Sequence, residues 1–150
     1  MKIGQLSART GCPVETIRYY EREGLLPEPA RSSGNYRLYA EPHEQRLRFI
    51  LHCRMLDMTL SEIRTLLNYH DHPYQPCDAV NGLIDDHLAH VDARITQLVA
   101  LREALATLRL RCNGETNSSQ CGILSALAEP AADMPGVSYE VSHVPRAHGR

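Results

Sequence analysis

Residues 3–39 read IGQLSARTGCPVETIRYYEREGLLPEPARSSGNYRLY, and this stretch decides the fold. Residues 3–8 predict a short helix, and Pro13 predicts the start of a second helix over about 13–23, because proline is favoured in the first helical turn. The turn Thr10-Gly11-Cys12 separates the two helices. Two helices joined by a short glycine turn have the outline of a helix-turn-helix, the motif that places its second helix on DNA.

A hairpin is expected next to these helices. Pro27, Pro29 and the run Ser32-Ser33-Gly34-Asn35 break helix, and Tyr36–Tyr39 alternates as a strand does. Such a hairpin would form a wing, so residues 1–70 predict a winged helix-turn-helix domain.

The second helix and the wing carry side chains that suit DNA. Arginine binds guanine edges or phosphates, and tyrosine and threonine hydroxyls bind phosphates. The candidate DNA-binding residues are Thr16, Arg18, Tyr19, Tyr20, Arg31, Asn35, Tyr36, Arg37 and Tyr39. Two observations favour a different interpretation: Tyr20 and Tyr39 also suit core positions, and three glutamates (Glu15, Glu21 and Glu23) make the helix less basic than a typical DNA reader.

The charge of the chain is unevenly distributed. The formal net charge is −2, but residues 1–54 hold nine Lys/Arg and six Asp/Glu, whereas residues 55–150 hold seven Lys/Arg and twelve Asp/Glu. The amino-terminal third can therefore present a basic face to nucleic acid.

Further helices follow the wing. Pro42 predicts a helix to about Leu56, and the capping box Thr59-Leu-Ser-Glu62 predicts another through Leu67. After a loop over 69–79, nothing but Gly82 interrupts helix from Val80 to Arg111, an element about 48 Å long at 1.5 Å per residue.

The long helix carries an apolar seam. Its seam residues alternate in steps of four and three, as in a coiled coil with one polar interruption: Ile84, Leu88, Val91, Ile95, Leu98, Arg102 and Leu105. The rest of the chain is too small to cover a seam of this length, so we expect the helix to pair with a second copy rather than pack on its own domain.

These patterns predict a mainly α protein with five parts. They are a winged helix-turn-helix DNA-binding domain (1–70), a linker loop (71–79), a dimerisation helix (80–111), a metal-binding loop with a short helix (112–128) and a flexible tail (129–150).

The amino-terminal part resembles a known family. The pieces TIRYYEREGLL and NYRLY are similar to the winged-helix signature of the MerR family of transcriptional regulators, and the likeness continues to about Leu127. The resemblance implies that the long helix forms an antiparallel coiled coil with its dimer mate. It also implies that Arg18, Tyr19 and Tyr20 act from the recognition helix, and Arg31, Tyr36 and Arg37 from the wing.

The cysteines predict a site shared between protomers. Cys77 precedes the long helix and Cys112 follows it, so a straight helix holds them nearly 50 Å apart, too far for one ion. In an antiparallel dimer, Cys77 of one protomer meets Cys112 of its partner, and symmetry makes two equivalent sites. Cys121 completes each site across a flexible polar loop, and the starts of the following helices favour thiolates at Cys77 and Cys121. Cys53, on an apolar helix face, and Cys12 suit buried positions.

Three thiolates favour a soft, thiophilic dication. The cysteine spacing and the stretch CRMLDMTLSEIRTLL (53–67) resemble the cadmium- and lead-responsive branch of the family. Mercury sensors share a similar triplet, and zinc sensors add further ligands in the loop that are not seen here. Zn(II) and Hg(II) are the alternative ions. Four histidines, His87, His90, His143 and His148, form a candidate second metal site, with solvated histidines as the alternative.

The expected function is that of a cytoplasmic regulator, because no apolar stretch suits a membrane span or a secretory signal. The resemblance implies a homodimer that binds promoter double-stranded DNA, and on binding Cd(II) or Pb(II) distorts the promoter so that RNA polymerase activates heavy-metal resistance genes. A thiol redox-sensing regulator is the alternative from another class. An enzyme is not expected, since a three-thiolate site offers neither a metal-bound water nor a general base.

Overall fold

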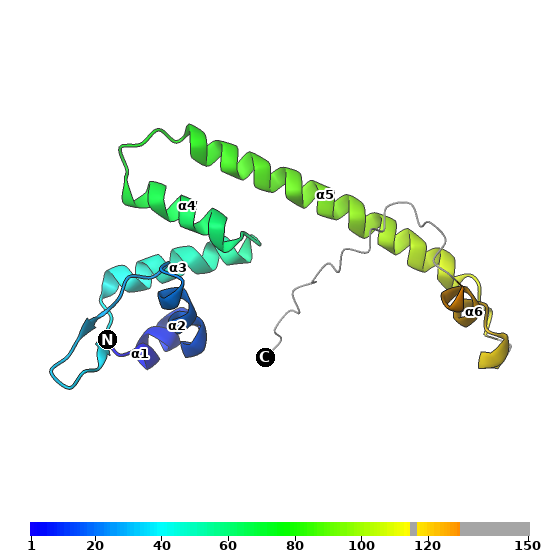
Figure 1. The fold of residues 1–150 in the computed structure, drawn as a ribbon, viewed down its shortest axis with the longest axis horizontal. Coiled ribbons are helices and arrows are strands. Elements are labelled where there is room, and N and C mark those ends of the chain that lie inside the picture. Colours follow the sequence, from blue (N-terminus) through cyan, green and yellow to red (C-terminus); the bar gives the residue numbers. More distant parts are fainter. Residues whose placement is uncertain (115–116, 130–150) are drawn as a thin grey trace. The chain divides into compact units, whose positions relative to one another are not determined.

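The computed structural model describes residues 1–114 and 117–129, and the chain divides into two compact units, Met1–His87 and the residues from Leu88 onward. Figure 1 shows the elements in chain order. They are α1 (Ile3–Thr10), α2 (Val14–Arg22), β1 (Ala30–Arg31), β2 (Arg37–Leu38), α3 (Glu41–Met55), α4 (Leu60–Asp71), α5 (Asp78–Arg109), the 3₁₀ turn η1 (Ser118–Gln120) and α6 (Gly122–Ala128).

The helix-turn-helix is present as predicted. Gly11 ends α1 in the left-handed conformation with φ 72°, where its N–H donates to the Ser7 carbonyl, and glycine adopts this conformation without steric cost. Pro13 is the N-cap of α2, and Ile17 points from that helix into the core with no exposed surface. The local turn chemistry therefore sets the angle between the two helices.

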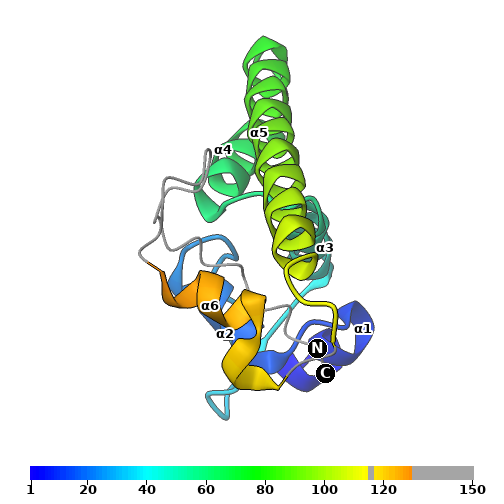
Figure 2. The same ribbon diagram turned by 90° about the vertical axis from the view of Figure 1, so that its right-hand side faces the viewer.

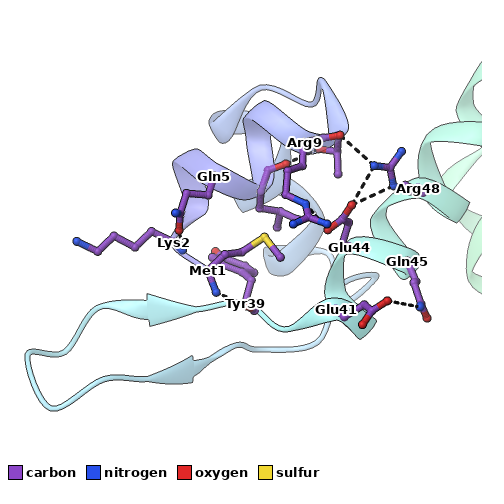
Figure 3. A network of polar contacts seen from close by, with 11 residues as sticks. Met1, Lys2, Gln5, Arg9, Tyr39, Glu41, Glu44, Gln45 and Arg48 are labelled. Carbon is purple, nitrogen blue, oxygen red and sulfur yellow. Dashed lines mark hydrogen bonds and ion pairs between the residues drawn. The ribbon is translucent and has the colours of Figure 1, made fainter.

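The wing is shorter than the sequence predicts. β1 and β2 pair antiparallel, with Ala30 opposite Leu38 and Arg31 opposite Arg37. Tyr39 leaves the strand because its backbone pairs with Met1 instead: Tyr39 N–H donates to the Met1 carbonyl at 2.8 Å, and the Met1 ammonium donates to the Tyr39 carbonyl at 2.6 Å. Figure 3 shows Met1 beside Tyr39 at the base of the hairpin. The first residue thus anchors the wing to the domain.

The boundaries of the later helices differ from the predicted ones by a few residues. The predicted capping box forms, with Glu62 N–H donating to Thr59 Oγ1 at 3.2 Å, but α4 continues to Asp71 instead of ending at Leu67. Pro73 follows shortly and breaks helix. α5 begins at Asp78 rather than Val80, since an acidic residue is favourable in a first turn. The loop between α4 and α5 is therefore residues 72–77 only.

Polar contacts from arginines on α3 and α4 hold the helix-turn-helix in place. They donate to backbone carbonyls at or near the carboxyl ends of α1 and α2: Arg48 to Arg9 O (3.0 Å), Arg46 to Leu25 O (2.6 Å) and Arg64 to Glu23 O (2.8 Å). Glu44, which is 5% exposed, forms ion pairs with Arg9 at 2.8 Å and Arg48 at 2.9 Å. Figure 3 shows the part of this network that joins Arg9 on α1 to Glu44 and Arg48 on α3.

The second unit has a different character. No described residue from Leu88 to Glu129 is buried, and eight large apolar side chains of α5 are 36–57% exposed. The exposed set includes six of the seven predicted seam residues: Ile84, Leu88, Val91, Ile95, Leu98 and Leu105. After α5, the chain turns back so that the start of α6 lies against Arg111, just beyond the end of that helix (Figure 2). The predicted tail, from residue 130 on, lies outside the described residues.

Candidate DNA-binding surface and thiol site

The exposed side of α2 carries three of the predicted DNA-binding residues. Tyr19 is 38% exposed, the side chain of Arg18 is 48% exposed, and Thr16 is half-buried. Arg18 lies 3.6 Å from Glu15, an exposed pair one turn away. Exposed pairs of this kind contribute little to stability, so phosphate can displace Glu15 from the guanidinium at small cost.

Glu21 does not face outward as a free negative charge. The Tyr39 hydroxyl donates to its carboxylate at 2.5 Å, and Arg37 Nε lies 3.4 Å from the same group. This carboxylate therefore ties the base of the wing to α2. The negative charge that argued against DNA binding is thus partly neutralised by the wing itself.

The wing presents a basic and aromatic surface. Arg31 donates to the Asn35 side chain at 3.0 Å, which orders the hairpin, and Asn35 occupies the left-handed region with φ 62°. The ammonium of Lys2 lies 5.4 Å from the centre of the Tyr36 ring, and Tyr36 is 65% exposed. Lys2 therefore extends this surface, and Arg22 is a further exposed cation on α2. Lys2 was missing from the predicted site because only the fold brings residue 2 beside residue 36.

Two predicted DNA-binding residues are core residues in the structure. Tyr20 is 5% exposed and Tyr39 is 2% exposed. Burial raises the pKa of both phenols, and in Tyr39 the hydrogen bond to Glu21 raises it further. The structure therefore corrects the prediction for these two: they position α2 and the wing from inside the domain. Sequence spacing could not separate them from their exposed neighbours.

Cys112 and Cys121 are brought together in the second unit. The backbone N–H groups of Leu124 and Ile123 donate to the Cys121 sulfur, and Cys112 donates to it from its side chain; these contacts lower the pKa of the Cys121 thiol. Both cysteines are half-buried. Two neighbouring thiols, one of them predisposed to ionise, are donor groups that suit a thiophilic ion.

Gly122 allows Cys121 to lie close to Cys112. A Cβ on Gly122 would collide with the Arg111 carbonyl oxygen, so any larger residue would push α6 away from the end of α5. Arg109 also donates to the Cys112 carbonyl at 2.8 Å, which fixes the residue after the helix. The sequence predicts a helix start after Cys121, but no local pattern predicts this close contact.

Cys77 belongs to the first unit. Its carbonyl accepts the first helical hydrogen bond of α5, from Asn81 N–H at 3.0 Å, and its side chain is exposed. Cys77 also lines a cavity of about 300 Å³, whose wall includes Phe49, Leu66 and Val80. A thiol at the start of α5 is therefore available to a ligand from outside the protomer.

The remaining cysteines are in the core, as predicted. Cys12 is 2% exposed and Cys53 is 7% exposed, and burial raises the pKa of both thiols. Neutral buried thiols behave as small apolar side chains. They are thus separated from the candidate metal ligands by their surroundings.

His87 of the candidate histidine site already has two protein partners. Nε2 lies 2.7 Å from the Leu56 carbonyl oxygen and Nδ1 lies 3.3 Å from the Glu62 carboxylate. The carbonyl contact, followed by the charge of Glu62, raises the pKa of His87 above its ordinary value. His90 is exposed one helical turn further along α5. His143 and His148 lie outside the described residues.

Comparison with known proteins identifies the family. The model of the MerR helix-turn-helix family of regulatory proteins matches residues 1–70, and the model described as MerR, DNA binding, matches residues 44–108. Among curated relatives, a protein named HTH-type transcriptional regulator ZntR homolog, from Haemophilus influenzae, is 51% identical over 109 residues, which cover 73% of this chain and 81% of that protein.

Two solved structures are also similar. The transcription regulator PbrR691 from Ralstonia metallidurans CH34, crystallised in complex with lead(II), is 53% identical with a TM-score of 0.78, over 85% of this chain and 99% of that chain. MerR from Bacillus megaterium MB1, in complex with mercury(II), is 28% identical with a TM-score of 0.64, over 86% of this chain and 100% of that chain.

These relatives are transcriptional regulators rather than enzymes, in agreement with the expectation from the sequence. No helix among the described residues is both long and apolar enough to cross a membrane. The winged helix-turn-helix, the long helix after it and the matches over residues 1–108 together show that this chain belongs to the MerR family of helix-turn-helix regulatory proteins.

Proposed function

We propose that this protein is a dimeric regulator that binds promoter DNA and activates heavy-metal resistance genes when it binds Cd(II) or Pb(II). The contact between Cys112 and Cys121, with the lowered pKa of Cys121, carries the proposal. Cys77 supplies the third thiolate from the other protomer. The identity of 53% to a regulator crystallised with lead(II) supports this choice of ion.

Dimer formation follows from the exposed seam. Six apolar residues along one stripe of α5 are at least one third exposed in the single chain, and a second α5 can cover them. In an antiparallel pair the start of one α5 lies beside the end of the other. Each dimer then has two equivalent three-thiolate sites, one at each end of the paired helices.

DNA is held by α2 and the wing. Arg18 and Tyr19 contact the DNA from the helix, and Arg31, Tyr36 and Arg37 from the wing, with Lys2 and Arg22 adding phosphate contacts. Metal biases two states of the dimer by its differential affinity for them. In the metal-bound state the promoter is distorted so that RNA polymerase engages it, at a deformation cost of about 1–6 kcal/mol.

The histidines form a second, separate proposal. His87, His90, His143 and His148 would bind a further ion, with His87 first releasing the Leu56 carbonyl or Glu62. Metal that remains bound after Cys77, Cys112 and Cys121 have all been replaced by serine supports this second site. If that variant binds no metal, the second site is ruled out.

Metal titration of the reduced dimer on its promoter tests the function. Cd(II), Pb(II), Zn(II) and Hg(II) are added in turn, while thiolate charge-transfer absorbance and transcription in vitro are recorded. We expect one ion per protomer at the cysteine site and activation by Cd(II) or Pb(II). A response confined to Zn(II) or Hg(II) reassigns the ion. A response to oxidant without any metal assigns a thiol redox sensor instead.

Two variants separate the two activities. Cys112→Ser removes the metal response and leaves operator affinity near that of the wild type, because this thiol and the DNA-binding residues belong to different units of the chain. Arg18→Ala weakens operator binding by about 1–3 kcal/mol and leaves the metal stoichiometry unchanged. Loss of both activities in either variant contradicts the proposed division of roles.

A further inference from the structure

We propose that His87 is a positioning residue that fixes the first turns of α5 on the α3–α4 turn and thereby couples Cys77 to the recognition helix α2. This inference rests on the proposed metal-dependent function. It gives His87 a role in transmitting the effect of metal binding to α2, and not in binding the ion at the cysteine site.

The surroundings of His87 support such a role. Its side chain is 14% exposed, and its two ring nitrogens point to two acceptors, the Leu56 carbonyl at 2.7 Å and the Glu62 carboxylate at 3.3 Å. Neither acceptor can donate, so a ring that carries protons on both nitrogens satisfies both contacts. These are long-range contacts, made to residues 31 and 25 positions away in the sequence.

The two acceptors belong to one turn. Leu56 is the C-cap of α3, and Asp57 adopts a positive φ of 60° directly after it. Glu62 accepts from Thr59 N–H at 2.9 Å and so caps α4. His87 therefore contacts the end of one helix and the capping residue of the next, and fixes the geometry between them.

The same turn leads to the recognition helix. Arg54 donates to the Met58 carbonyl at 2.8 Å, across the turn. The Arg54 guanidinium also lies close to the hydroxyl of Tyr20, which is buried on α2, and it opposes the rise that burial causes in the pKa of this phenol. A shift of the turn therefore changes the position of Arg54, and Arg54 contacts the helix that carries the DNA-binding side chains.

Cys77 is joined to His87 by the first turns of α5. Val80 and Leu83 of this segment pack against the core of the first unit, and Cys77 lines the cavity beside it. Apolar contacts are non-directional and allow a helix to slide or rotate. Hydrogen bonds have a narrow range of angles and distances. His87 is the residue of this segment that makes directional side-chain contacts to the α3–α4 turn, so it converts a displacement of Cys77 into a displacement of that turn.

His90 provides a matched control. It is exposed on the same helix, one turn beyond His87, and belongs with His87 to the candidate histidine metal site. A role for His87 in binding a second ion predicts equal effects of changing either residue. A positioning role predicts a larger loss of activation from changing His87 than from changing His90.

The experiment compares wild type, His87→Leu, His87→Gln and His90→Gln as full-length dimers. An operator duplex is first selected by the wild-type protein from a random DNA pool. Operator affinity, thiolate absorbance with Cd(II) and Pb(II), and metal-activated transcription are then measured. We expect His87→Leu to keep the thiolate band and the metal stoichiometry but to lose about tenfold in activation, within the usual range of coupling between sites.

The conservative variant tests the hydrogen bond itself. The amide of His87→Gln can donate to the Leu56 carbonyl, so this variant recovers part of the activation. His90→Gln leaves both contacts of His87 in place and should lose less activation than His87→Leu. Equal activation by His87→Leu and wild type overturns the positioning role alone. Equal losses in His87→Leu and His90→Gln overturn it in favour of a metal site. If the wild type responds to neither ion, the proposed function and the positioning role both fail.

Discussion

The two units of this chain differ in where their apolar side chains lie: the first unit buries them and the second exposes them. Residues 1–87 bury fourteen apolar side chains in one cluster around the helix-turn-helix, whereas the described residues from Leu88 to Glu129 bury none. A domain with its own core can fold alone, but an exposed seam on a long helix needs a second copy. The amino-terminal unit is thus stabilised by its own core, whereas the carboxy-terminal unit exposes the apolar seam that a second copy can cover.

Cysteine illustrates the same contrast. In the first unit, Cys12 and Cys53 are buried and burial raises the pKa of each thiol. In the second unit, Cys121 is half-buried beside Cys112, and backbone N–H groups lower the pKa of its thiol. Cysteine is therefore an apolar core residue at Cys12 and Cys53, whereas Cys121 is predisposed to form a thiolate.

The largest expected effect comes from charging the seam. Ile95→Asp combined with Leu98→Asp places two carboxylates where two helices meet, at a cost of at least about 3 kcal/mol. Sedimentation should show a monomer that neither binds the operator tightly nor assembles the three-thiolate site. Gln97→Glu, a change to an exposed neighbour, should remain dimeric. A dimeric double variant would show that the seam is not the interface.

The second-largest effect is expected from a substitution that leaves a cavity in the core of the first unit. Leu47 has no exposed surface, so Leu47→Ala should lower the free energy of unfolding by about 2–5 kcal/mol. The matched control is Leu110→Ala, at a residue 86% exposed, with an expected change within about 0.5 kcal/mol. Urea unfolding followed by circular dichroism measures both. Equal losses would mean that Leu110 is covered in the dimer.

Gly122→Ala should act on the metal site alone. Its methyl group would collide with the Arg111 carbonyl oxygen and move Cys121 away from Cys112. We expect metal affinity to fall about tenfold or more, as for changes in the surroundings of metal ligands. Operator affinity without metal should stay unchanged. Competition with a chromophoric chelator gives the affinity, and an unaltered value contradicts the close approach.

The smallest effect concerns acid stability. The hydrogen bond from Arg48, with the charges of Arg9 and Arg48, lowers the pKa of the buried Glu44 carboxyl. A lowered pKa in the folded state stabilises the protein above the pKa of the unfolded chain, and this contribution is lost as pH falls through the folded value. Glu44→Gln should therefore flatten the decline in unfolding midpoint below about pH 5. Glu41→Gln, at an exposed residue, should keep the wild-type decline.

Much of the fold was predictable because its signals are local. Gly11 and Pro13, the capping box at Thr59, and the four-three spacing of the seam each depend on residues within a few positions of one another. These signals define the helix-turn-helix, the start of α4 and the exposed stripe on α5. The boundaries were less accurate, since α4 and α5 extend into the predicted loop.

The long-range contacts could not be predicted from the sequence. The bond between Tyr39 and Glu21 joins residues 18 positions apart, and the bond between His87 and the Leu56 carbonyl joins residues 31 apart. No spacing rule specifies either pairing, because tertiary packing brings the groups together. For the same reason the sequence could not show that Tyr20 and Tyr39 are buried supports of the DNA-binding surface.

The sharing of each metal site between protomers is the central claim, and a mixed dimer tests it directly. A Cys77→Ser protomer is paired with a Cys112→Ser protomer, and the heterodimer is purified through two different affinity tags. Symmetry predicts one intact three-cysteine site per heterodimer and none in either homodimer. Titration with Cd(II) or Pb(II) should therefore give one thiolate-bound ion per heterodimer. Heterodimers that bind no ion at three thiolates would contradict the shared site.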